Sequence, residues 1–126
     1  MDTYQAGVCN IGGAEVARRR QVAIIGGVIY LALSIYAIVQ NFSPVASLAL
    51  FAPATLFAVG FVQSRKRFCF AFGLMGTFNF QKLGSLTKVE DKAALAADRK
   101  MALTIIVQSL GIALILTALV IFVNSF

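Results

Sequence analysis

The chain has 126 residues, of which 60 % are hydrophobic and 13 % are charged, and its formal net charge is +6. Because an ordinary soluble domain is about 25 % charged, this composition excludes a disordered chain, a disulfide-rich secreted scaffold and a coiled coil, and it favours residence in a bilayer. The sequence contains no histidine, which excludes histidine-ligated metals and Ser-His catalysis, so we expect a protein without catalytic activity, cofactor or metal.

The first predicted membrane helix covers residues 21–40, and a polar segment, residues 1–20, precedes it. The apolar run is about as long as the 20 residues that a spanning helix needs. It is too long for the apolar region of a cleaved signal peptide, so we expect the chain to retain it as a membrane helix.

The second predicted membrane helix covers residues 44–63. In the short break before it, Ser43 is a good helix N-cap and Pro44 a good first helical residue. The two apolar runs are therefore predicted to form a tight helical hairpin. Pro53 lacks a backbone N–H and predicts a kink within the second helix.

Residues 68–80 are apolar but too short to cross a membrane. We predict that this segment lies in the membrane interface; a re-entrant segment and a continuation of the second helix are the alternatives. Its five phenylalanines are candidate contacts for lipid or for a partner subunit: Phe68, Phe70, Phe72, Phe78 and Phe80.

The last predicted elements are a cytoplasmic amphipathic helix over residues 82–100 and a third membrane helix over residues 101–123. Thr87 with Glu90 three residues later is a capping-box pattern, which predicts a helix start at this point. The two elements form either one continuous helix or two helices with a kink near Lys100. The sequence thus predicts an all-α membrane protein with three transmembrane helices.

All eleven Lys and Arg residues lie outside the three predicted spans. Because basic residues stay in the cytoplasm, we expect a cytoplasmic N-terminus and a C-terminus on the outer side of a bacterial inner (plasma) membrane. Two basic triplets are expected to orient the chain and to contact anionic lipid headgroups: Arg18, Arg19, Arg20, Arg65, Lys66 and Arg67. With its basic residues in that role, the chain is expected to have no nucleic-acid partner.

Two cysteines, Cys9 and Cys69, both fall on the predicted cytoplasmic side, where thiols stay reduced. Both lie near basic residues, which favour the thiolate, so both are candidate reactive thiols. Packing as small apolar residues is the alternative. Two sulfurs without histidine do not complete a four-ligand metal site within one chain. The two cysteines are brought close together if the N-terminal segment folds back on residues 68–80.

Two stretches of the sequence resemble known proteins. They are Cys9-Asn10-Ile11-Gly12 and, in residues 68–80, the pattern Phe-Cys-x-x-Phe-Gly-x-x-Gly-x-Phe-Asn-Phe. Together they resemble a group of small uncharacterised bacterial inner-membrane proteins. The second stretch also resembles the transmembrane domain of YgaP-like proteins, which place a Phe-Cys pair and a glycine-rich step after two membrane helices. This chain has Phe70 and Phe72 where Pro and Tyr are expected, and it has a third helix. The resemblance implies sulfur or redox chemistry as one function.

Three functions are compatible with these features. The small size and the absence of ionisable residues from the predicted spans favour a non-catalytic accessory or structural subunit of a larger membrane complex, such as a respiratory or other energy-transducing assembly. A thiol- or sulfur-handling membrane protein that uses Cys9 and Cys69 is the second function. A small homo-oligomeric transporter or channel is the third, and it depends on Gln108, the most polar side chain deep in the third span. We expect Gln108 to hydrogen-bond to another helix, with substrate binding as the alternative. The expected partners are anionic lipids and other membrane subunits.

Overall fold

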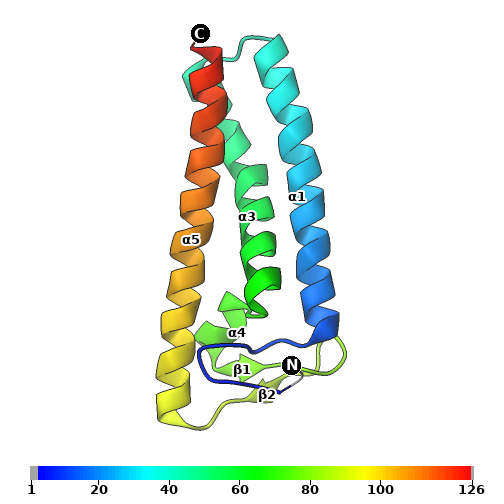
Figure 1. Ribbon diagram of the computed structural model, residues 1–126, viewed down its shortest axis with the longest axis vertical. Helices are drawn as coiled ribbons and strands as arrows, with labels where there is room; N and C mark the ends of the chain where they lie inside the picture. Colours follow the sequence, from blue (N-terminus) through cyan, green and yellow to red (C-terminus); the bar gives the residue numbers. More distant parts are fainter. Residues whose placement is uncertain (1–2, 126) are drawn as a thin grey trace.

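The computed structural model describes residues 3–125, which fold into the helices and short strands of Figure 1. In chain order these are α1 (Gly13–Val39), α2 (Pro44–Ser47), the 3₁₀ turn η1 (Leu48–Leu50), α3 (Phe51–Lys66), α4 (Phe70–Met75), β1 (Thr77–Phe78), β2 (Thr87–Lys88) and α5 (Lys92–Asn124). Three segments are long and apolar enough to cross a membrane: Gly13–Val39, Pro44–Lys66 and Lys92–Asn124. They confirm the predicted all-α class and the three spanning helices, so the chain is an integral membrane protein.

The three long helices lie side by side, with α3 between α1 and α5 (Figure 1). Helices α1 and α5 run in one direction and α3 runs in the other. The start of α1, the end of α3 and the start of α5 therefore meet at one end, together with α4, β1 and β2. We call this the basic end, because it includes Arg18–Arg20, Arg65–Arg67 and Lys92–Lys100.

Helix α1 begins at Gly13, earlier than the predicted residue 21, so the first basic triplet is helical. Glu15 lies in its first turn, where a carboxylate interacts favourably with the helix dipole. The start of the next helix agrees with the sequence prediction. Ser43 is its N-cap and its Oγ accepts a hydrogen bond from the Ala46 N–H at 3.1 Å, while Pro44 is the first helical residue.

The second spanning segment is not a uniform α-helix. Its first turn is α2, the 3₁₀ turn η1 follows, and the α-helix resumes as α3 at Phe51. Pro53 has no N–H to donate to the carbonyl of Ala49, which lies within η1. The kink expected from Pro53 is thus present as the 3₁₀ turn η1, which lies one helical turn before the proline.

The predicted helix over residues 82–100 is wrong in its first half. Thr87 and Lys88 form β2, which pairs with β1 in an antiparallel register, Thr77 opposite Lys88 and Phe78 opposite Thr87. The β-branched Thr87 suits a strand, and pairing with β1 uses the backbone groups that a helix would need. Helix α5 begins at Lys92 with Asp91 as its N-cap, and it continues unbroken to Asn124. The continuous form of the last helix is therefore confirmed.

Helices α1 and α3 approach each other closely through two glycines. A Cβ atom at Gly26 would lie 2.5 Å from the backbone N of Phe57, and one at Gly60 would lie 2.6 Å from the backbone N of Ala23. Since real Cβ atoms do not approach that closely, these helix faces require glycine. Helix α5 is held against α1 by the Tyr30 hydroxyl, which donates to the carbonyl of Leu116 at 2.7 Å.

Candidate functional site

The N-terminal segment folds back across the basic end onto residues 68–80. The Asn79 N–H donates to the carbonyl of Asn10 at 2.9 Å, and the Gly12 N–H donates to the carbonyl of Asn79 at 2.8 Å. Ile11 and Asn79 form an isolated parallel bridge. Two stretches that lie far apart in the sequence are therefore joined by their backbones.

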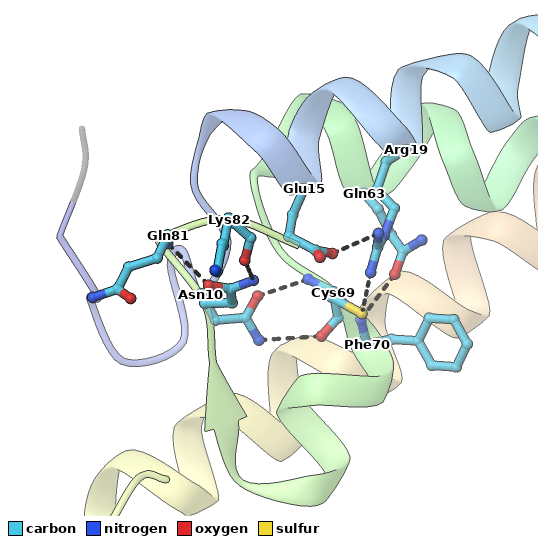
Figure 2. A network of polar contacts seen from close by, with 9 residues as sticks. Asn10, Glu15, Arg19, Gln63, Cys69, Phe70, Gln81 and Lys82 are labelled. Atoms are coloured by element: carbon cyan, nitrogen blue, oxygen red, sulfur yellow. Dashed lines mark hydrogen bonds and ion pairs between the residues drawn. The ribbon is translucent and has the colours of Figure 1, made fainter. Parts of the chain in front are cut away.

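Asn10 holds the backbone of Cys69 from both sides, as Figure 2 shows. Its side-chain oxygen accepts from the Cys69 N–H at 2.7 Å, and its side-chain nitrogen donates to the Cys69 carbonyl at 3.1 Å. Both residues are buried, with 0 % of Asn10 and 3 % of Cys69 exposed. Because a buried backbone group without a partner is costly, this pair of bonds fixes the position of Cys69 at the start of α4.

The sulfur of Cys69 has its own partner on α1. Arg19 Nη2 donates to Cys69 Sγ at 3.1 Å, and Arg19 Nη1 forms an ion pair with Glu15 at 2.7 Å (Figure 2). The guanidinium of Arg19 also lies 5.8 Å from the centre of the Phe72 ring. The Arg19 guanidinium therefore places a positive charge beside the Cys69 sulfur. Carboxylate, guanidinium and thiol thus form one chain of contacts from α1 to α4.

Gln63 connects the end of α3 to the same site. Its side-chain oxygen accepts from the Phe70 N–H at 3.0 Å, and its backbone carbonyl accepts from the Phe68 N–H at 3.2 Å. Arg67 ends α3 in a left-handed conformation with φ of 53°, and its carbonyl accepts from the Asn10 N–H at 3.0 Å. We call Asn10, Glu15, Arg19, Gln63 and Cys69 the latch, because these side chains join the N-terminal segment, α1, α3 and α4.

A second buried contact ties the N-terminal segment to α5. Asp98 is 0 % exposed; one of its carboxylate oxygens accepts from the Tyr4 hydroxyl at 2.6 Å and the other from the Gly7 N–H at 2.7 Å. Burial, and then the hydrogen bond to Asp98, raise the pKa of the Tyr4 hydroxyl. The ring of Tyr4 stacks on Phe78 at a centroid distance of 4.6 Å.

A pocket of about 480 Å³ lies beside the latch. Its walls are formed by α1, by α3 and α4, and by the loop between β1 and β2: Glu15, Arg18, Arg19, Val22, Gln63, Phe72, Gly84 and Leu86. Three of the five latch side chains face this pocket, so a small molecule within it would meet a carboxylate, a guanidinium and an amide.

The two candidate thiols are both buried, and each has a different neighbour. Cys9 is 1 % exposed and its Sγ donates to the carbonyl of Thr3 at 3.4 Å, whereas the sulfur of Cys69 accepts from Arg19. Both remain thiols. Among residues 3–125 no group of three or more cysteine, aspartate or glutamate side chains is arranged to hold a metal ion.

The predicted lipid-contact residues divide into two groups. Arg18, Arg20 and Arg65 are exposed and available to headgroups. Arg19 is engaged by Glu15 and Cys69, so its assignment to a headgroup is corrected. Lys66 and Arg67 are half-buried.

Phe68 is 0 % exposed and packs in the core with Val62, Ala102 and Ile105, so the expectation that it contacts lipid or a partner is wrong. It turns inward because the left-handed residue before it reverses the chain after α3. The other four phenylalanines, Phe70, Phe72, Phe78 and Phe80, are half-buried.

Gln108 does not make the interhelical hydrogen bond expected of it. It is exposed, and its side chain lies at a groove between α3 and α5, where Arg65 and Lys66 also lie. The hydrophobic pattern alone does not show which face of a uniformly apolar helix turns toward its neighbours, which is why this prediction failed.

Three residues of the site carried no clear signal in the sequence. Gln63 and Asp98 accept hydrogen bonds from residues that are brought close to them by the fold, and the sequence around each residue does not indicate these partners. Asn10 lies within the Cys9–Gly12 stretch, which was noted for its resemblance and not for hydrogen bonding. An acidic residue within an alanine-rich helical stretch, as at Asp98, was the one available hint.

Comparison with known proteins identifies no relative: no protein-family model, curated protein or solved structure matches the chain. Its function is therefore inferred from its own residues.

Proposed function

We propose that this chain is a non-catalytic accessory subunit of a larger membrane complex, such as a respiratory or other energy-transducing assembly of a bacterial inner membrane. One observation supports this most: the side chains of the latch and of Asp98 are largely buried and are bonded to other groups of the chain. Asn10 holds Cys69, Arg19 pairs with Glu15, and Asp98 holds Tyr4 and Gly7. Groups that are used to stabilise the fold are not disposed to act on a substrate.

Exposed apolar residues at the basic end support a partner. Leu74 and Met75 on α4 are 43 % and 60 % exposed, and Leu83 and Leu86 in the β1–β2 loop are 47 % and 50 % exposed. They lie outside the three spans, so the hydrocarbon core of the bilayer does not account for them. Exposed apolar residues of this kind are typical of interaction surfaces. We assign them to the contact with the neighbouring subunits.

The charge distribution supports the orientation within that complex. The eleven Lys and Arg residues of the sequence all lie outside the spanning segments predicted from it, and the basic end gathers the triplets of α1 and α3 with the start of α5. By the tendency of basic residues to stay inside, the basic end faces the cytoplasm. Arg18, Arg20 and Arg65 then face anionic headgroups.

The test uses the double variant Leu83→Gln, Leu86→Gln. A tagged chain is extracted in mild detergent after chemical cross-linking in the membrane, and co-purifying proteins are quantified by mass spectrometry. The unaltered chain is expected to retain one or more membrane proteins at a fixed ratio, and the double variant to lose them while its melting temperature changes little. Val45→Gln, an equally polar change at the far end, is the matched control. Equal retention by all three chains contradicts the assignment of this surface.

A thiol-handling function is the second candidate, and the Arg19–Cys69 contact at 3.1 Å beside the pocket favours it. In this function the thiolate of Cys69 is the nucleophile and Arg19 stabilises its charge. Glu15, paired with Arg19, positions the guanidinium.

Alkylation of Cys69 by iodoacetamide, in a Cys9→Ser background, separates the two candidates. The accessory function predicts that Cys69 reacts more slowly than a cysteine in an unstructured peptide, because its side chain is buried. A faster reaction that Arg19→Gln slows would support thiol chemistry and would overturn the non-catalytic assignment.

A further inference from the structure

A groove between α3 and α5 has a volume of about 610 Å³. Its walls include Phe61, Arg65 and Lys66 on α3, and Gln108, Gly111 and Ile115 on α5. The groove therefore has two cationic side chains at the basic end and apolar walls that extend into the span. This is the distribution of polarity along a phospholipid, whose charged headgroup leads into an apolar tail.

Gln108 places an amide in the wall of this groove, and the hydrocarbon tail of a lipid offers that amide no hydrogen-bond partner. Its amide is exposed, and within residues 3–125 no side chain or backbone group serves as its hydrogen-bond partner. Val62 and Ile105 belong to the same core cluster, so Gln108, almost one helical turn farther along α5, lies deeper in the span than Arg65. An amide at that depth needs an acceptor. The ester carbonyls of a phospholipid lie on the tail side of its phosphate and supply one.

Arg65 is shared between this groove and a second one. The second groove, about 440 Å³ between α1 and α3, is lined by Arg20, Gly27, Phe57, Phe61 and Arg65 among others. Phe57 and Phe61 stack at 5.7 Å, and the Arg65 guanidinium lies 6.0 Å from the centre of the Phe61 ring. A ridge of stacked rings with Arg65 at its basic end thus separates two apolar grooves.

We propose that α3 carries one specifically bound anionic phospholipid. Its phosphate lies at Arg65, between Arg20 and Lys66, and its ester carbonyl accepts from Gln108. One acyl chain lies in each groove on either side of Phe61. The positive charges at the basic end of the grooves favour a lipid with a net negative charge. The amide of Gln108 favours a lipid whose acyl chains are joined by ester linkages. This inference goes beyond the accessory function and does not depend on a partner subunit.

The test titrates the purified, delipidated chain in detergent with phosphatidylglycerol and with phosphatidylcholine, and counts lipid adducts by native mass spectrometry. One phosphatidylglycerol is expected to bind, with an affinity at least tenfold above that of phosphatidylcholine. Arg65→Gln should weaken phosphatidylglycerol binding by about fivefold and phosphatidylcholine binding by less, because the choline cation offsets the charge of the phosphate in phosphatidylcholine. Gln108→Leu should weaken the binding of both lipids equally, because both contain ester carbonyls.

Gly111→Phe tests the groove itself. A Cβ atom at Gly111 meets nothing within 4 Å, so the ring enters open space in the groove without moving the backbone, and binding of both lipids should fall. Leu110→Phe, the same aromatic side chain at an exposed neighbouring position outside the groove, should leave binding unchanged. Equal affinity for the two lipids, or unchanged binding in Gly111→Phe, overturns the proposal. A dimer that Gly111→Phe dissociates also overturns it, since the occupant is then a second copy of the chain.

Discussion

At the residue scale, the basic end depends on a few buried or half-buried polar side chains, and most of their bonds join distant parts of the chain. Asn10 bonds to Cys69, Arg19 bonds to Cys69 and Glu15, and Asp98 bonds to Tyr4. A buried polar group is stabilising while its partner is present and costly when the partner is removed. A single substitution in the latch should therefore lower the free energy of unfolding by more than the loss of one hydrogen bond would, because it also leaves a buried polar group without its partner.

Replacing Asn10 by alanine removes both bonds to Cys69 and leaves the buried Cys69 N–H without a partner, while the Cys69 carbonyl still accepts from the Gly73 N–H at 3.0 Å. We expect the free energy of unfolding in detergent to fall by about 2 kcal/mol. The measurement is a denaturant titration followed by circular dichroism, with Gln40→Ala, an exposed amide in the loop between α1 and α2, as the control. If Asn10→Ala and Gln40→Ala are equally stable, the latch does not stabilise the fold.

The Tyr4–Asp98 contact predicts a pH dependence. Burial and the bond to Asp98 raise the pKa of Tyr4 in the folded chain above its value of about 10 in the unfolded chain. Folding then favours the neutral phenol, so this contribution to stability is complete below about pH 10 and is lost as the pH rises through the folded-state pKa.

Tyr4→Phe keeps the ring that stacks on Phe78 and removes the hydroxyl. The variant should melt below the unaltered chain at pH 8, and the difference in melting temperature should narrow as the pH is raised to about 11. A difference that stays constant over this range would show that the hydroxyl does not titrate as described.

At the scale of the elements, packing depends on where the helices place their small residues. Gly26 lies against the backbone of α3, whereas Gly111 on α5 faces open space. The same substitution should therefore have opposite effects at the two positions.

Gly26→Ala should lower the free energy of unfolding by about 1–3 kcal/mol, because the added methyl group forces α1 and α3 apart. Gly111→Ala should be neutral or stabilising by up to about 1 kcal/mol, since alanine favours the helix and meets no neighbour. Thermal unfolding of the two variants in one detergent compares them directly. A destabilised Gly111→Ala with a stable Gly26→Ala would contradict the helix packing.

The sequence predicted the spanning helices because apolar runs without charge have one stable arrangement in a bilayer. It also located the turn between the first two spans, since Ser43 and Pro44 act through their immediate neighbours. Long-range contacts had no local signal. The capping-box pattern at Thr87 was overridden by pairing of β2 with β1, and the latch requires the chain reversal at Arg67.

At the scale of the whole molecule, the arrangement of the three long helices brings the basic residues of α1, α3 and α5 to one end. All of these residues therefore lie on the same side of the membrane, and the topology is decided by which side that is. We predict that a cysteine at Glu90 is cytoplasmic and that one at Ser125 is external. In a background of Cys9→Ser and Cys69→Ser, a membrane-impermeant maleimide should label Ser125→Cys in intact cells. It should label Glu90→Cys after permeabilisation alone. The reverse pattern would invert the proposed topology.

The accessory function makes one claim about the whole molecule, which is that the chain does not work alone. The mass of the particle that contains it, after mild extraction from its own membrane, tests this claim most directly. We predict a particle much heavier than the 13.5 kDa chain with other membrane proteins at a fixed ratio. A particle of 13.5 kDa plus lipid and detergent, or one built from copies of this chain alone, would contradict the account.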